Sequence, residues 1–137
     1  MSLPLADFES TYKEARPKEI ISREKLNRHI AKNNDNCLAR QLRIDGYVIT
    51  ENIKKCDYLV LNDDKCAAYF IELKGSDITG AIEQIEQTVK KLEKDLRGYD
   101  KKLRIVYSGK VISGSIAEWK KKNRNADAKH RILEENI

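Results

Sequence analysis

Residues 56–75 read CDYLVLNDDKCAAYFIELKG, two apolar runs joined by the polar segment 62–66. The polar segment contains Asn and Asp, which favour turns, so the pattern predicts an antiparallel β-hairpin. If the turn centres on Asp64 and Lys65, Asp57 lies opposite Glu72 on the neighbouring strand. Folding would then bring two acids from distant positions to one place on a sheet.

The chemistry of this hairpin follows from strand geometry. Directly opposed residues of an antiparallel pair have Cβ atoms about 4.5–5.5 Å apart, which lets two carboxylates chelate one divalent cation. Side chains alternate between the two faces of a strand, so Lys74 lies on the same face as Glu72, while Ile71 and Leu73 point the other way. The sequence therefore predicts two acids and an amine around one point.

Asp57 followed by Glu72-Leu73-Lys74 resembles the motif of the PD-(D/E)xK nuclease superfamily, whose members share a restriction-endonuclease-like fold. Cys56 stands where the motif has its Pro, a residue that is often missing in the family. The resemblance implies that Asp57, Glu72 and the backbone carbonyl of Leu73 hold Mg²⁺, for which Mn²⁺ can substitute. It also implies that Lys74 positions or helps to deprotonate the attacking water.

General chemistry agrees with these implied roles. Mg²⁺ prefers hard oxygen ligands and usually keeps several waters when one or two carboxylates hold it. It lowers the pKa of a bound water and offsets charge that builds on a phosphate, and a neighbouring lysine adds a second positive charge. The function that the resemblance implies is a metal-dependent nuclease, a hydrolase that cuts the phosphodiester bonds of DNA or RNA.

The acid-x-Lys tripeptide carries little information alone, since 36% of the residues are charged. The same pattern occurs at residues 63–65, 100–102, 118–120 and 127–129. Only residues 72–74 end an apolar strand, follow a hairpin that begins with an Asp, and precede a well-marked helix. The alternative interpretation is an ordinary hairpin whose edge exposes a few charges.

The rest of the chain predicts an α/β fold in the order helix, strand meander, helix, strand. Residues 17–31 have Pro17 in a first turn and apolar residues at three-to-four spacing, which predicts a helix. Residues 38–44 read as a strand, and the turn signal Asp45-Gly46 predicts a return strand at 47–49. A helix capped by Asp77 or Thr79 follows the motif hairpin. Residues 103–107 read as a strand that joins the sheet in parallel through a crossover after this helix. The order is similar to a restriction-endonuclease-like core with a mixed sheet of four to five strands.

The resemblance also implies supporting site residues. Gln84 lies on the second predicted helix ten positions after Lys74, where some exonuclease-like branches of the superfamily carry a Gln that braces the metal site. Thr88 stands where those branches have Tyr, and a solvated helix Gln is the plain alternative. Many members supply a Glu from the first helix, for which Glu19 and Glu24 are both candidates, with a slight preference for Glu24.

The length of 137 residues predicts one domain, with its core at about residues 18–107 and a basic, helical C-terminal segment at 113–137. No apolar run reaches the about 20 residues needed to cross a bilayer, and the N-terminus lacks the pattern of a secretory signal. The expectation is a cytoplasmic protein with no membrane partner.

Charge independently favours a polyanionic partner, because the net charge is +5 and the isoelectric point is about 9.0. Nucleic acid, DNA in the first place, is the partner expected. Lys54 and Lys55 precede Asp57 and are candidate phosphate contacts. The cluster Lys120-Lys121-Lys122 is another candidate, although a lysine run is usually a solvated face. Trp119 beside it could stack on a base, but the spacing Ile112, Ile116, Trp119 favours packing into the core.

Two other functions remain open. One is a nucleic-acid-binding module that keeps the fold without catalysis. The other is a protein-interaction domain in which the apolar stripe of the second helix forms a homodimer. An amphipathic helix that covers its own sheet is the more economical account of that stripe, which consists of Ile82, Ile85, Val89, Leu92 and Leu96.

Overall fold

The hairpin forms as the sequence predicts. In the computed structural model, which describes residues 2–111 and 114–137, β4 (Tyr58–Asn62) pairs antiparallel with β5 (Ala67–Lys74). Tyr58 is opposite Ile71, so Asp57, one position earlier, falls opposite Glu72. The Oδ1 of Asn62 accepts the backbone N–H of Lys65 at 3.0 Å and closes the turn. The register on which the two-acid prediction depends is therefore present.

A large mixed sheet surrounds this hairpin in the order β3-β4-β5-β6-β7. The pairs β3–β4 and β4–β5 are antiparallel, whereas β5–β6 and β6–β7 are parallel. The remaining strands are β3 (Ala39–Arg43), β6 (Asp100–Tyr107) and β7 (Ala126–His130). The meander and the parallel strand after the helix agree with the predicted order.

Two helices, counted among the described residues, cover one face of the large sheet: α1 (Ile78–Leu92) and α2 (Ser115–Lys122). Of the two predicted caps, Asp77 is the one that forms, because its Oδ1 accepts the N–H of Gly80 at 2.9 Å. The apolar stripe of α1 packs against its own sheet, and Leu96 is buried just beyond the end of the helix. Trp119 is also buried in this layer, with 4% of its surface exposed.

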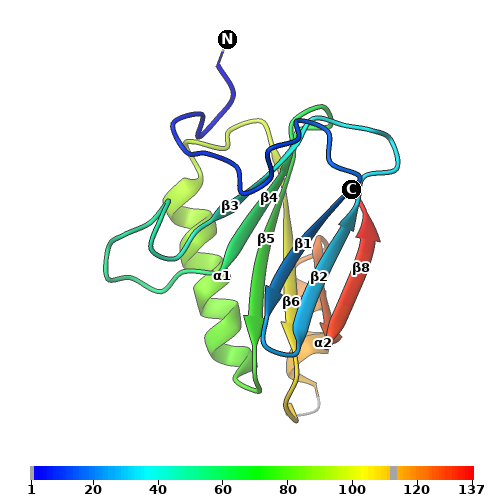
Figure 1. Ribbon diagram of the computed structural model, residues 1–137. Helices are drawn as coiled ribbons and strands as arrows, with labels where there is room; N and C mark the ends of the chain where they lie inside the picture. The colour runs from blue at the N-terminus through cyan, green and yellow to red at the C-terminus, as the bar shows by residue number, and fades with distance from the viewer. Residues whose placement is uncertain (1, 112–113) are drawn as a thin grey trace.

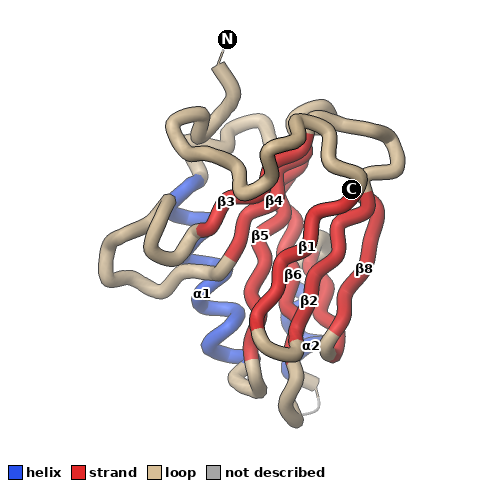
Figure 2. Tube along the Cα trace, viewed as in Figure 1, coloured by secondary structure: helices blue, strands red, loops and turns tan. Residues whose placement is uncertain are grey.

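A small mixed sheet covers the other face, in the order β1-β2-β8 (Figures 1 and 2). Its strands are β1 (Glu19–Glu24), β2 (Asn27–Lys32) and β8 (Ile132–Asn136). Residues of β5 alternate between the two layers: Phe70 packs toward the helices, while Ile71 packs toward the small sheet. The molecule is thus a mixed α/β structure of three layers with the large sheet in the middle.

The helix predicted at residues 17–31 is wrong, because this segment forms the β1–β2 hairpin. Its burial has period two: Ile20 and Ser22 are buried in β1, and His29 and Ala31 are buried in β2. Some of the buried positions are polar, so the apolar residues do not alternate along the sequence. Their remaining spacing of three to four residues resembles that of a helix. Packing against the large sheet outweighs that local preference.

The return strand predicted at 47–49 is also absent from the described residues. Asp45 and Gly46 do form a tight turn, in which Gly46 has a φ of +82° and Ile49 donates its N–H to the carbonyl of Ile44 at 3.0 Å. The chain then leaves the sheet, and β3 pairs directly with β4 instead. The predicted turn at Asp45 and Gly46 is therefore confirmed, but the short segment after it does not pair with the sheet.

The C-terminal segment contains more sheet than predicted. The α2 helix fits the predicted helical character, but β7 adds an edge strand to the large sheet and β8 pairs parallel with β2. Ile112 and the first residue of the predicted segment, Ser113, lie outside the described residues. Within the described part of the chain, no helix is long and apolar enough to span a membrane.

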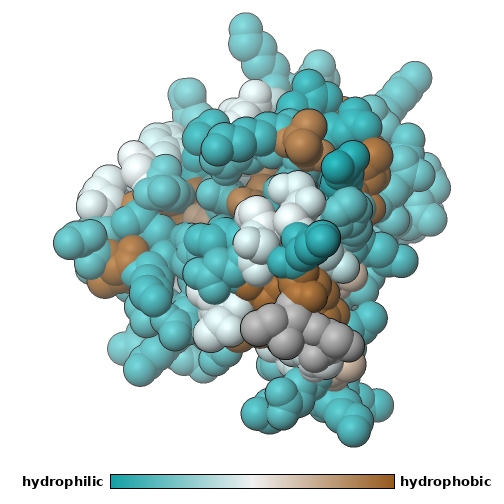
Figure 3. Space-filling view, turned by 90° about the horizontal axis from the view of Figure 1, so that it is seen from below, coloured by the Kyte–Doolittle hydropathy of each residue, from teal (hydrophilic) through white to brown (hydrophobic). Residues whose placement is uncertain are grey.

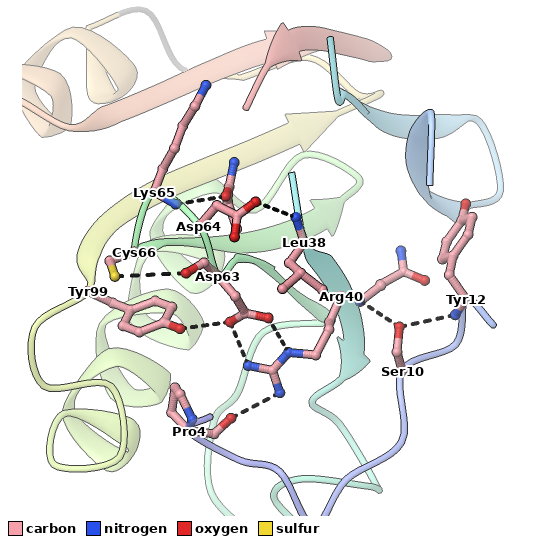
Figure 4. Close-up of polar contacts among 12 residues, drawn as sticks. Pro4, Ser10, Tyr12, Leu38, Arg40, Asp63, Asp64, Lys65, Cys66 and Tyr99 are labelled. Atoms are coloured by element: carbon pink, nitrogen blue, oxygen red, sulfur yellow. Dashed lines mark hydrogen bonds and ion pairs between the residues drawn. The ribbon is translucent and has the colours of Figure 1, made fainter. Parts of the chain in front are cut away.

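A polar cluster fastens the N-terminal segment to the turn end of the hairpin (Figure 4). The Asp63 carboxylate accepts two hydrogen bonds from Arg40, at 2.7 and 2.8 Å, and one from the Tyr99 hydroxyl at 2.7 Å. Arg40 also donates to the carbonyl of Pro4 at 3.0 Å. These contacts lie at the opposite end of β4 and β5 from Asp57 and Glu72, since the five residues of β4 separate Asp57 from Asp63 by about 20 Å.

Candidate functional site

A pocket of about 400 Å³ opens where β5 ends. It gathers residues from the β1–β2 turn, the start of β4, the end of β5, α1 and the end of β6. Its lining is Glu24, Lys25, Asn27, Asp57, Glu72, Leu73, Lys74, Gly75, Gln84 and Ser108. Figure 3 views this end of the molecule, whose surface is mostly hydrophilic. The structure thus brings together the predicted acids, the lysine and the glutamine.

Asp57, which directly precedes β4, is bonded to the end of β5 on its β4 side. Its backbone N–H donates to the carbonyl of Ile71 at 3.1 Å, and its Oδ2 accepts the N–H of Leu73 at 2.9 Å. The N–H and C=O of one strand residue point to the same side, so the Leu73 carbonyl also faces this side. Asp57, Glu72 and the Leu73 carbonyl therefore border one space.

Glu72 is a buried acid, with 2% of its surface exposed. Its Oε1 is buried and has no hydrogen-bond partner. The pKa of Glu72 is raised to about 9, first by burial and then by the negative charge of Asp57, while the positive charge of Lys74 opposes the shift. Burial likewise raises the pKa of Asp57 to about 6. Burial thus disfavours the charged form of both neighbouring acids.

Lys74 is oriented by Gln84. The Lys74 ammonium donates to Oε1 of Gln84 at 2.8 Å, while Nε2 of Gln84 donates to the carbonyl of Lys55 at 3.2 Å. The second bond fixes which end of the amide faces Lys74. An ammonium carries three donors, so two N–H groups of Lys74 are left for a water or a phosphate oxygen.

The β1–β2 hairpin supplies residues that the predicted first helix was expected to supply. Glu24 lines the pocket, whereas Glu19, at the other end of β1, pairs with Lys32 at 2.8 Å. Asn27 is a pocket residue that sequence reasoning missed. Its Nδ2 donates to the carbonyl of Lys74 at 2.8 Å, and its Oδ1 is buried without a partner. Lys25 and Ser108 were also missed, since neither lies in a recognisable motif.

The predicted phosphate contacts are less available than expected. Lys54 pairs with Glu83, and the Lys55 ammonium lies 3.7 Å from Asp45 and donates to the carbonyl of Glu51 at 2.6 Å. Both lysines line a neighbouring pocket that shares Lys74 and Gln84 with the site. In the other cluster, Lys120 pairs with Asp127 at 3.3 Å, and Lys121 and Lys122 are exposed on α2.

The residues present fit a hard divalent cation. Among the residues that the structure describes, no three His, Cys, Asp or Glu side chains form a metal-binding group by themselves. Mg²⁺ does not need such a group, since it is usually held through one or two carboxylates and several waters. Asp57, Glu72 and the Leu73 carbonyl supply hard oxygens, and the unpartnered Oε1 of Glu72 lacks the partner that a cation would provide.

Comparisons with known proteins assign this protein to no family. No family model matches the chain, no curated protein matches it, and no solved structure matches it. The function is therefore inferred from the pocket and its residues.

Proposed function

We propose that this protein is a metal-dependent nuclease of the PD-(D/E)xK type, which hydrolyses phosphodiester bonds of DNA, with RNA as the other substrate class. The observation that carries the proposal is the shared pocket of Asp57, Glu72 and Lys74 at the end of β5. Neither the motif nor the pocket alone would suffice, because acid-x-Lys is common in this chain and polar pockets are common on proteins.

The arrangement of elements supports a restriction-endonuclease-like core. An antiparallel meander leads into α1, and α1 leads into β6 parallel to β5, as in the fold that the motif implies. The chain departs from that pattern at its N-terminal side, where the β1–β2 hairpin replaces the first helix. Glu24 reaches the pocket from this hairpin and can take the place of the helix-borne Glu.

Each residue has a role that its contacts suit. Asp57, Glu72 and the Leu73 carbonyl would hold Mg²⁺ or Mn²⁺, which when bound supplies Lewis-acid activation of water and phosphate. Lys74 would donate to the attacking water or to a phosphate oxygen, and Gln84 would keep the ammonium directed into the pocket. Asn27 would steady the same strand end through its bond to the Lys74 carbonyl.

Glu72→Gln and Lys74→Met test these roles. Both keep the approximate side-chain size but remove a metal-binding charge or an ammonium, so nucleolytic activity should fall by about 10²-fold or more. The assay is release of label from DNA and RNA, single- and double-stranded, with Mg²⁺ or Mn²⁺, and EDTA should abolish the release.

Glu86→Gln and Lys102→Met are matched controls, because they make the same chemical changes outside the pocket lining. They should retain the activity of the unmodified protein. Cleavage that survives both site substitutions would refute the assignment. Salt-sensitive binding without cleavage under any divalent ion would instead favour the non-catalytic binding module.

A further inference from the structure

Two arginines oppose one another on the outer face of the β1–β2 hairpin. Arg23 is directly across from Arg28 in the strand register. The adjacent pair, Ser22 and His29, is buried toward the large sheet, so strand alternation places both arginines on the solvent side. Like charges directly opposed across strands are unfavourable. The pair therefore favours an anionic partner.

A third arginine lies near the β1–β2 hairpin through its contacts with Tyr58. Arg43, at the end of β3, stacks its guanidinium 5.3 Å from the ring centre of Tyr58 and donates to the Tyr58 hydroxyl at 3.3 Å. That hydroxyl lies 3.5 Å from the carbonyl of Arg23. Tyr58 directly follows Asp57 in the chain, so the contacts connect Arg43, the hairpin and the site.

These three arginines, the arginine face, differ from three of the five lysines predicted to bind phosphate. Within residues 2–111 and 114–137, no ion pair involves Arg23, Arg28 or Arg43. Lys54, Lys55 and Lys120 each have an acidic partner instead. Charge that is not neutralised within the protein remains available for an anionic ligand, and guanidinium groups suit phosphate geometry.

The arginine face continues into the pocket. Lys25, in the β1–β2 turn between Arg23 and Arg28, is exposed and lines the pocket together with Glu24. Lys25 therefore places a positive charge at the tip of the hairpin, between its outer face, which carries Arg23 and Arg28, and the pocket that contains Asp57 and Glu72.

We infer that the arginine face binds the phosphodiester backbone of a nucleic-acid strand whose next phosphate enters the pocket. This inference rests on the proposed function, since it names the surface on which the substrate of that site lies. Binding of this kind releases counterions, so the logarithm of the affinity falls linearly with the logarithm of the salt concentration. The slope counts the phosphates that are contacted.

The test measures affinity for a labelled DNA strand, and for an RNA strand of the same sequence, between about 50 and 200 mM salt. Fluorescence anisotropy is recorded in EDTA, so cleavage plays no part. The triple variant Arg23→Gln, Arg28→Gln, Arg43→Gln should reduce the slope by about 2–3, because each lost phosphate contact removes about 0.7–0.9.

Two controls match this variant. Lys120→Gln, Lys121→Gln, Lys122→Gln removes the same charge from α2 and should leave the slope close to that of the unmodified protein. Leu26→Ala changes the exposed tip of the same hairpin without changing charge, and should also keep the slope. Thermal unfolding of each variant shows whether it is folded.

The outcomes separate the two proposals. Binding with the expected slopes but without metal-dependent cleavage supports the arginine face and refutes the nuclease. Cleavage that depends on Glu72, with unchanged slopes in the arginine variant, refutes the arginine face alone. Equal losses in the arginine and lysine variants, or no binding at 50 mM salt, would also overturn the inference.

Discussion

Glu72 lowers the free energy of unfolding, because it buries a carboxyl group away from water. Without a cation the folded protein keeps this group protonated, as its pKa of about 9 indicates. The unfolded chain releases the proton near the ordinary value of 4.5. A bound cation would reverse the preference by giving the charged form a partner. Ion binding and proton release at this residue are therefore coupled.

The coupling predicts the pH dependence of stability without metal. Because the pKa of Glu72 is raised in the folded state, the fold binds more protons than the unfolded chain between pH 4.5 and about 9. The Glu72 contribution to the free energy of unfolding should therefore fall by about 3 kcal/mol between about pH 5 and pH 7. In Glu72→Gln this contribution should be absent, while the smaller loss that follows from the pKa of about 6 of Asp57 should remain; urea titrations at the two pH values measure both.

Two comparisons complete that experiment. Glu86→Gln, on the exposed side of α1, should follow the unmodified protein at both pH values. Mg²⁺ added at pH 7 should raise the free energy of unfolding of the unmodified protein and not that of Glu72→Gln. Parallel pH profiles for the Glu72 variant and the unmodified protein would contradict the shifted pKa.

At this scale the sequence predicted that the acids and the lysine lie close together, since hairpin register and strand alternation are local rules. Asp57, Glu72 and Lys74 required only a correct turn centre. Asn27 could not be found in the same way, because it reaches Lys74 from a strand 47 positions earlier in the chain. Nothing local distinguishes a buried Asn in a polar stretch from a solvated one.

At the scale of elements, α1 was predictable and the N-terminal hairpin was not. The apolar stripe of α1 continues for about three turns, from Ile82 to Leu92, and the helix has a clear cap, so local sequence and tertiary packing agree. Residues 19–32 bury Ser22, Asn27 and His29 on the face that packs inward, which hides the period-two pattern from a hydrophobicity reading. Buried polar residues need partners from other elements, and those partners become visible only in the folded chain.

The cap of α1 gives an element-scale prediction. Asp77→Ala removes the acceptor of the Gly80 N–H and should lower the free energy of unfolding by about 1 kcal/mol. For a chain of this size the melting temperature should fall by about 3–5 °C. Thr79→Ala is the matched control, because Thr79 is exposed and does not cap the helix. Thermal unfolding followed by circular dichroism measures the melting temperatures. An equal fall in melting temperature in both variants would contradict the cap assignment.

At the scale of the whole molecule, a buried polar network joins the two sheets. The Glu135 carboxylate of β8 accepts two hydrogen bonds from Arg104 of β6, at 2.7 and 2.9 Å, and lies 2.7 Å from Nε2 of His29 in β2. This network connects residues more than 100 positions apart, because β8 pairs with β2. No local rule links the C-terminus to the second strand, which is why the sequence did not predict the small sheet.

Glu135→Gln tests that network, with a pH dependence opposite to that of Glu72. Burial disfavours the charged form, but hydrogen bonds from His29 and Arg104 outweigh it and lower the pKa of Glu135 to about 2. Its contribution is therefore fully present above pH 4.5 and is lost as the pH falls through 2. At pH 7 Glu135→Gln should lower the free energy of unfolding by about 3 kcal/mol, and its difference from the unmodified protein should shrink toward pH 2.

Glu134→Gln changes the exposed neighbour on the same strand and should leave the free energy of unfolding almost unchanged. Urea titrations of both variants across the acid range distinguish the outcomes, since equal losses at pH 7 would mean that the sheets are held together without this carboxylate.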